Sequence, residues 1–305
     1  VVTELARNLL RHAREGELVL QGRETPPTST LDVLAIDRGP GMADVAACLR
    51  DGFSTAGTPG TGLGAVRRLS EVFDLHSQRE RGTVVLARLC QPAEGQAGAA
   101  DAQARAVDET GIRWGVVAFP APGESVCGDG WAVTSSASAI SFLVADGLGH
   151  GPEAARASEI VCRSFRAEPD APPDRMLDRA SRDAAGSRGA AAAIAQADLA
   201  SDRLVFAGIG NISASIIGPA GGQGMVSMNG IVGGQARSIR SFEHAWAPGT
   251  LLVMHSDGLA SRWSLDEHPG LAWNDPAVIA AVLCRDHARG RDDVTVLVAR
   301  REPRR

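Results

Sequence analysis

The residues of this chain most suited to chemistry are aspartates at the ends of apolar segments. Four large apolar runs of the second half begin or end at one of them: Asp129, Asp146, Asp257, and the pair Asp292 and Asp293. One aspartate in a turn is ordinary. Several that meet at one point would repel one another unless a cation lay among them, and carboxylate oxygens without His or Cys favour Mg²⁺ or Mn²⁺. The pattern therefore predicts a site for hard divalent cations.

The glycine-rich stretch ADGLGHGP, residues 145–152, allows two interpretations. A dinucleotide-binding loop requires the spacing GxGxxG after a strand, but here the third glycine stands at position 151 and a proline follows it. We therefore interpret the glycines as freeing the backbone around Asp146, and Asp146 as a metal ligand. His150, inside the stretch, could act on a leaving group or could serve in packing and helix capping.

Two polar residues near the N-terminus share one helix face. Glu4 and Asn8 are four residues apart, so an α-helix places them one turn apart. A carboxylate and an amide oxygen in that relation suit a Mg²⁺–phosphate site, although the same spacing also occurs on solvated helix faces. Asp37 follows an apolar run and precedes Gly39 and Gly41, so a ligand could approach the backbone while the carboxylate accepts from an amine.

These residues need helices and strands to position them. Apolar residues at helical spacing predict helices over residues 1–14, 44–50, 63–73, 152–165, 175–185 and 276–288. The pattern predicts strands over 30–36 and 84–89. After residue 111 it predicts a series of strands whose short polar turns indicate antiparallel sheets, over residues 113–119, 130–136, 139–145, 190–199, 203–209, 213–218, 249–256 and 293–301. The glycine loop 52–65 runs into an expected helix N-terminus, which is a ready anion site.

The segment 91–110 is rich in Ala, Gly and Gln and predicts a linker between two α/β domains, over residues 1–90 and 111–305. Charged residues make up 22% of the chain and the net charge is -5, so nucleic acid is not an expected partner. Every basic residue is arginine, which excludes P-loop and Schiff-base lysine chemistry. The scattered cysteines and the absence of a long apolar run favour a cytoplasmic protein without a membrane partner.

The motifs of the first half together resemble the GHKL family of ATP-binding domains (the Bergerat fold), especially the switch serine kinases of bacterial stressosomes. The likeness rests on ELARN, DRGPGM, DGFSTAG, GTGLGA, VRRLSEVFD and a final GT. It implies an α/β sandwich that binds ATP with Mg²⁺, with Glu4 as catalytic base and Asn8 near the ion. It implies that Asp37 recognises adenine, with Gly39 and Gly41 flanking the base and Thr83 near it. It also implies contacts to the phosphates from Gly60, Gly62 and Gly64. Family members carry a strand and a helix before the first motif, so we expect this domain to lack its first elements.

The motifs of the second half resemble the metal-dependent protein phosphatases (PPM, type 2C), in particular their SpoIIE-like branch. The matching segments are CGD, VADGLGHG, GIGN, HSDG and DDVTVLVA. The likeness implies an α-β-β-α sandwich with antiparallel sheets and a site for two Mn²⁺ or Mg²⁺ ions. The ligands that it implies are Asp129, Asp146, the Gly147 carbonyl, Asp257 and Asp292, with Asp293 beside them. We interpret Asn211 of GIGN as a turn residue.

Together the two likenesses predict a metal-dependent phosphoserine/phosphothreonine protein phosphatase fused to a serine-kinase-like domain. Glu4 would be catalytic in the first half, and Asp146 and Asp257 in the second. The likenesses imply STAS-domain antagonist proteins as substrates, in a partner-switching pathway. One alternative is a non-catalytic partner-binding switch with a degraded kinase half. Another is an active kinase whose phosphatase only resets it.

Overall fold

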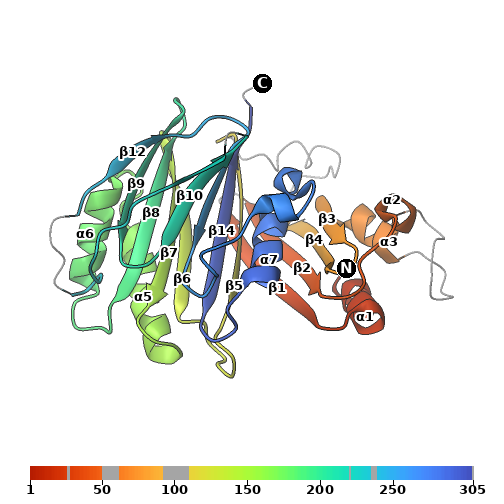
Figure 1. Ribbon diagram of the computed structural model, residues 1–305. Helices are drawn as coiled ribbons and strands as arrows, with labels where there is room; N and C mark the ends of the chain where they lie inside the picture. The colour runs from red at the N-terminus through yellow and green to blue at the C-terminus, as the bar shows by residue number, and fades with distance from the viewer. Residues whose placement is uncertain (26–27, 50–61, 92–109, 220, 235–238, 304–305) are drawn as a thin grey trace. The chain divides into compact units, whose positions relative to one another are not determined.

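The computed structural model describes all of the chain except residues 26–27, 50–61, 92–109, 220, 235–238 and 304–305. The chain divides into two units (Figure 1). Unit 1 comprises residues 1–109 and 264–285, and unit 2 comprises residues 110–263 and 286–305. Unit 1 thus takes in a segment from the second half of the sequence. The expected mixed α/β architecture with antiparallel sheets is confirmed.

Unit 1 is built on one four-stranded sheet of order β1-β2-β4-β3, in which all neighbours are antiparallel. Its strands are β1 (Gly16–Thr25), β2 (Thr28–Asp37), β3 (Val72–Gln78) and β4 (Gly82–Gln91). Its first helices are α1 (Val2–His12), α2 (Val45–Cys48) and α3 (Gly62–Leu69). Helices α1 and α3 pack their apolar sides on one face of the sheet, where Leu5 and Val66 meet Val33, Ala35 and Val85.

The sequence missed strand β1, and it was wrong about the end of α3. The predicted helix over 63–73 ends at Leu69, and strand β3 begins at Val72. The hydroxyl of Ser70 donates to the carbonyl of Val66 at 2.7 Å, a local side-chain contact that competes with further helical bonding. Val72 and Phe73 continue the helical spacing by chance and belong to the strand.

Unit 2 contains two five-stranded antiparallel sheets, of order β12-β9-β8-β7-β6 and β11-β10-β13-β14-β5. The first has strands β6 (Asp129–Ser135), β7 (Ala139–Gly147), β8 (Ala190–Asp198), β9 (Arg203–Ile209) and β12 (Phe242–Ala245). The second has strands β5 (Ile112–Phe119), β10 (Ser213–Gly218), β11 (Gly221–Gly224), β13 (Leu251–His255) and β14 (Val294–Arg301). The sequence predicted all of these except the short strands β11 and β12.

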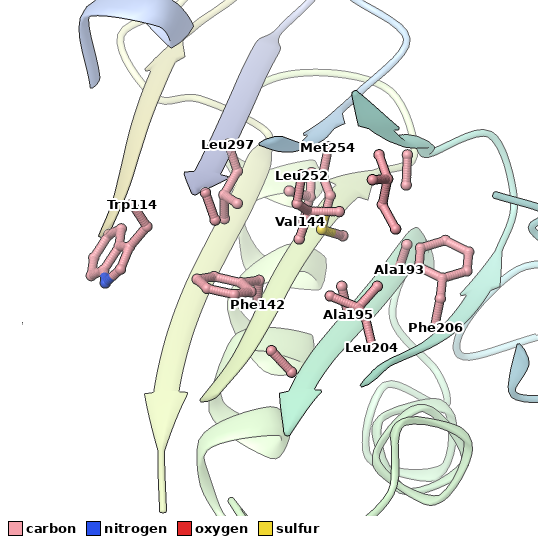
Figure 2. Close-up of a cluster of buried hydrophobic side chains, with 14 of the residues drawn as sticks. Trp114, Phe142, Val144, Ala193, Ala195, Leu204, Phe206, Leu252, Met254 and Leu297 are labelled. Carbon is pink, nitrogen blue, oxygen red and sulfur yellow. The ribbon is translucent and has the colours of Figure 1, made fainter. Parts of the chain in front are cut away.

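The two sheets of unit 2 pack face to face through one apolar layer. Figure 2 shows Phe142 and Phe206 of one sheet beside Leu252, Met254 and Leu297 of the other. Alternate residues of each strand point into this layer, as the two-residue period of a strand requires. The opposite face of the first sheet is covered by helices α5 (Pro152–Arg166) and α6 (Pro173–Asp183).

The remaining helical elements lie between strands β13 and β14 in sequence. They are the short helices η1 (Leu265–Glu267) and η2 (Leu271–Trp273), and α7 (Pro276–His287). Residues 276–285 of α7 are all buried, as expected for a helix that is apolar on every side. No helix in the described part of the chain is both long and apolar enough to cross a membrane.

Candidate active site

The fold brings two of the predicted aspartates together directly. Asp129 begins β6 and Asp146 lies near the end of β7, and the two residues are register partners in the antiparallel pair. Just beyond, the amide of Gly147 donates to the carbonyl of Gly128 at 3.3 Å. A side chain at Gly147 would collide with the carbonyl of Ala154, so the backbone here is closely enclosed. Only glycine therefore permits this approach of α5 to the strand that carries Asp146.

Asp129 is buried, and only one of its two carboxylate oxygens accepts a hydrogen bond from the described residues. Its Oδ2 accepts a hydrogen bond from the hydroxyl of Ser256 at 2.6 Å, and that hydroxyl accepts from the amide of Thr295 at 2.9 Å. Its Oδ1 has no hydrogen-bond partner in the described part of the protein. Because a buried carboxylate oxygen without a partner is costly, this oxygen marks a position where a cation fits.

The two adjacent aspartates before β14 lie in different environments. Asp293 is buried, and its Oδ1 accepts from the amide of Ala121 at 2.8 Å. Its Oδ2 has no partner among the described residues and would lie 2.5 Å from a Cβ built on Gly128. Asp292 is exposed, and its Oδ1 accepts from the amide of Asp293 at 2.9 Å. The structure thus turns Asp293, rather than Asp292, toward the Asp129 side of the cluster.

The acids influence one another electrostatically. Burial raises the pKa of Asp146 to about 8, and the charges of Asp129, Asp257, Asp292 and Asp293 add to that shift. Burial likewise raises the pKa of Asp129 to about 7, with further contributions from Asp293 and Asp292. Each carboxylate is therefore destabilised in its charged form by its surroundings, as expected where several acids share one site.

The carboxylate oxygens of this cluster are of the type that binds a divalent cation, although they are not arranged around one point. Unpartnered oxygens of Asp129 and Asp293 are buried at the site, and the mutual repulsion of the acids is the kind that a cation relieves. As they stand, no three or more His, Cys, Asp or Glu side chains of the described residues are grouped closely enough to hold a metal ion. The carboxylates would have to move toward an ion to bind it.

Asn211, which the sequence indicated as a turn residue, lies in a bend between two strands and also contacts one of the acids. The Nδ2 of Asn211 donates to Oδ2 of Asp257 at 2.7 Å. Asn211 lies between β9 and β10, and Asp257 follows β13, which pairs with β10. The available signal was the motif GIGN itself, which placed an amide next to a strand that borders the acids. The contact makes Asn211 a residue that orients Asp257.

Three other reactive side chains near the acids, those of Cys127, His150 and His255, are occupied by contacts of their own. Burial raises the pKa of Cys127 to about 12, and its thiol donates to the carbonyl of Phe119 at 3.3 Å, so it is a protonated thiol. His150 is exposed, and its Nδ1 lies 2.6 Å from Oε1 of Glu124. His255 is buried against Trp263 and the carbonyl of Ser256, and burial lowers its pKa.

The structure of unit 1 brings the Glu4–Asn8 pair and the GTGLGA motif together. Glu4 and Asn8 lie on α1, and a Cβ built on Gly62 would be 3.4 Å from Oε2 of Glu4 and 3.9 Å from Oδ1 of Asn8. The N-terminus of α3 therefore faces the polar side of α1. Glu4 also accepts from Nη1 of the exposed Arg7 at 3.0 Å. Gly64 is buried within α3, and Gly60 lies outside the described residues.

The residues predicted to lie around adenine cluster near the turn that follows β2. Oδ1 of Asp37 accepts from the amide of Gly39 at 2.6 Å, which holds the carboxylate over its own turn. Gly41 has φ 70° and no room for a side chain, because a Cβ there would collide with the carbonyl of Gln78. Thr83 is buried, and its hydroxyl lies 2.9 Å from that of Ser77. These residues form one turn region at the end of β2.

Comparisons with known proteins match the two parts of the chain to different proteins. Residues 136–302 match the family model described as Stage II sporulation protein E (SpoIIE). The chain is 37% identical over 86 residues to the serine/threonine-protein kinase RsbT of Bacillus subtilis (strain 168), a match that covers 28% of this chain and 65% of RsbT. The chain thus spans just under two thirds of the length of RsbT.

The phosphoserine phosphatase RsbX of the same organism is 22% identical over 138 residues, which covers 45% of this chain and 69% of RsbX. A solved structure of RsbX in complex with magnesium is 19% identical, with a TM-score of 0.53, and covers 62% of this chain and 94% of that one. These likenesses show the fold of unit 2.

A solved structure from work on the bacterial stressosome, as a modular system adapted to control secondary messenger signaling, is 29% identical. Its TM-score is 0.58, and the match covers 62% of this chain and 99% of that chain. The SpoIIE model spans more than half of the present sequence. The chain therefore belongs to the SpoIIE family, and its N-terminal part is similar to RsbT.

Proposed function

We propose that the chain removes phosphate from phosphoserine or phosphothreonine of a protein, with Mn²⁺ or Mg²⁺ held by the acid cluster of unit 2. The observation that carries this proposal is the pair of buried, unpartnered oxygens, Oδ1 of Asp129 and Oδ2 of Asp293. Asp146, Asp257, Asp292 and the Gly147 carbonyl complete the proposed donor set. Two ions in such a site supply charge compensation for the phosphoryl group and activate a water near neutral pH.

The side chains of this protein have separate tasks in that reaction. Ser256 fixes one oxygen of Asp129, which leaves the other oxygen aimed at the site. Asn211 orients Asp257 in the same way through Oδ2. The protonated thiol of Cys127 is a poor nucleophile at neutral pH. Water would then attack the phosphorus directly, the bond from phosphorus to the serine or threonine oxygen would break, and no phosphorylated enzyme would form.

The proposed protein substrates are STAS-type antagonists of a partner-switching pathway. The likeness of the two parts of the chain to RsbT and RsbX supports this choice. We further propose that the Glu4–Asn8 helix and the Asp37 turn bind ATP with Mg²⁺. The proximity of Gly62 to Glu4 and Asn8 supports that site. Phosphorylation by Glu4 as base would then let one chain add and remove the same mark.

Phosphate release from a phosphoserine STAS protein tests the proposal, with and without Mn²⁺, for the unaltered chain and Asp146→Asn. Release that needs the metal and is lost in the variant is the expected result. A folded chain that releases no phosphate from any phosphorylated STAS protein would refute the phosphatase and favour a non-catalytic partner-binding switch.

A further inference from the structure

The segment 264–285 belongs to the phosphatase by sequence and to the kinase-like unit by structure. It lies between Asp257 and Asp292, inside the range matched by the SpoIIE model. In the fold it is part of unit 1. The chain therefore leaves unit 2 after one candidate metal ligand, packs into unit 1, and returns just before the next.

The segment is anchored in unit 1 by a buried ion cluster. Nε and Nη2 of Arg88 donate to the two oxygens of Asp32 at 2.6 and 2.8 Å, within the sheet. Nη1 and Nη2 of the same guanidinium donate to Asp275 of the segment at 3.3 and 3.4 Å. All three residues are less than 10% exposed. Because buried charges must be paired, losing Asp275 from this cluster would leave a charge poorly compensated.

A second set of contacts fixes the same part of the segment. Oδ2 of Asp74 accepts from the amide of Asp275 at 2.5 Å, and its Oδ1 accepts from Nδ2 of Asn274 at 2.9 Å. The same amide group of Asn274 donates to the carbonyl of Leu75 at 3.0 Å. Asp74, like Arg88 and Asp32, lies on the sheet face opposite to α1 and α3. The segment is thus held on that face by specific hydrogen bonds and ion pairs, and we call this set of contacts its seat.

The end of the segment also contacts the proposed nucleotide region. Nη1 of Arg285 donates to the carbonyl of Asp37 at 3.4 Å, and Arg38 donates back to the carbonyl of Arg285. Asp37 is the residue whose carboxylate was predicted to bind adenine. The backbone of that turn and the end of α7 therefore cannot move independently.

Where the segment leaves and re-enters unit 2, the two strands of chain are tied together. Leu259 and Ala288 form an isolated antiparallel bridge. The amide of Ala260 donates to the carbonyl of His287 at 2.9 Å. The amide of Arg289 donates to the carbonyl of Gly258 at 2.8 Å. We call residues 258–260 and 287–289 the neck. Gly258 directly follows Asp257, and Asp292 comes three residues after the neck ends.

We propose that segment 264–285 is a coupling element, through which the state of unit 1 sets the position of the neck and hence of Asp257 and Asp292. Displacement of the segment from its seat, or of the Asp37 turn by a bound nucleotide, would shift the neck and change the affinity of the acid cluster for metal. The last step rests on the proposed metal site. The movement of the neck does not.

Amide hydrogen exchange and Mn²⁺ calorimetry on the full chain test this coupling. Asp275→Asn removes a charge from the Arg88 cluster, and Asn274→Ala is a milder second variant that removes two hydrogen bonds. The matched control is Val66→Ala, which weakens the core of unit 1 on the opposite face of the sheet. We expect both segment variants to speed exchange of the neck amides by about tenfold, as local opening of an anchored segment would. The control should leave these amides within about twofold.

Mn²⁺ binding gives the second readout and separates this inference from the proposed function. We expect Asp275→Asn to weaken Mn²⁺ binding at least about threefold, and Val66→Ala to leave it unchanged. Unchanged neck exchange in both segment variants would overturn the coupling. Equal effects of Val66→Ala would also overturn it, since the response would then be general loosening of unit 1. Faster neck exchange in a chain that binds no Mn²⁺ would support the link and refute the metal site.

Discussion

The acid cluster of unit 2 and the Glu4–Asn8 face of unit 1 differ in how much the fold constrains them. Asp129 and Asp293 are buried, and each has one oxygen held by protein and one left without a partner. Glu4 is partly exposed and pairs with the exposed Arg7. Burial makes the cluster of unit 2 costly unless a ligand is bound, whereas the helix face of unit 1 is stable with or without one. A site that the fold tolerates only at a cost is the stronger indication of function.

The largest expected effect is that of Asp129→Asn on unit 2. We expect phosphate release to fall by about a thousandfold or more, because a metal ligand is lost. The metal-free protein should become more stable at pH 8, because burial disfavours the charge of Asp129. Activity assays and thermal melts in a chelator measure the two effects. Asp198→Asn is the matched control, because Asp198 is also the terminal residue of a strand but caps an exposed turn. If Asp129→Asn lost both activity and stability, the buried acid cluster of unit 2 would not be costly to the fold, and its contrast with unit 1 would be wrong.

The next effect concerns Asn211. Asn211→Ala should lower phosphate release by about 10- to 100-fold and raise the Mn²⁺ concentration needed, the range typical of residues that orient a metal ligand. Gln196→Ala removes another side-chain amide, bonded to Ser141 and Ala171 rather than to the cluster, and should have little effect. Titration of activity with Mn²⁺ measures both. If Asn211→Ala needed no more Mn²⁺ than the unaltered chain, Asn211 would be a turn residue only and would not orient Asp257.

A smaller effect is expected in unit 1. Asn8→Ala should weaken binding of ATP with Mg²⁺ by about tenfold, because one neutral oxygen ligand is lost. Arg11→Ala, an exposed change on the same helix, is the control. Calorimetry with and without Mg²⁺ checks the result. Equal binding by the unaltered chain and by Asn8→Ala would leave unit 1 as a partner-binding module without this nucleotide site.

The smallest effect is the pH dependence of stability. Between the ordinary pKa of 3.8 and the folded values of about 7 and about 8, the folded protein keeps protons on Asp129 and Asp146 that the unfolded chain releases. The metal-free fold should therefore lose stability as the pH rises through this window. Mn²⁺ should reverse the loss at pH 8, by a few degrees in Tm. A metal-free Tm that rises from pH 5 to pH 8 would contradict the buried cluster.

Much of unit 2 was predictable from local pattern, and less of unit 1. Long apolar runs such as residues 139–147 are buried along almost their whole length and give a strong signal, so their strands were expected. Strand β1, with the sequence GELVLQGRET, mixes polar residues and glycines and gives a weak signal. Strand β3 was absorbed into a helix because its first apolar residues kept the helical spacing. In the structure the contact of Ser70 with Val66 lies at the end of that helix, and the amide of Glu71 already donates to the carbonyl of Arg88 in the sheet.

By itself the sequence determined the order of the two parts, the acids at the strand ends and the polar face of α1. These are properties of neighbouring residues, and period and residue type are enough to read them. The tertiary structure decided which oxygens lack partners, that Asp293 rather than Asp292 turns toward Asp129, that Asn211 reaches Asp257, and that residues 264–285 belong with unit 1. Each of these depends on contacts between distant parts of the chain, which arise from sheet register and packing and have no local signature in the sequence.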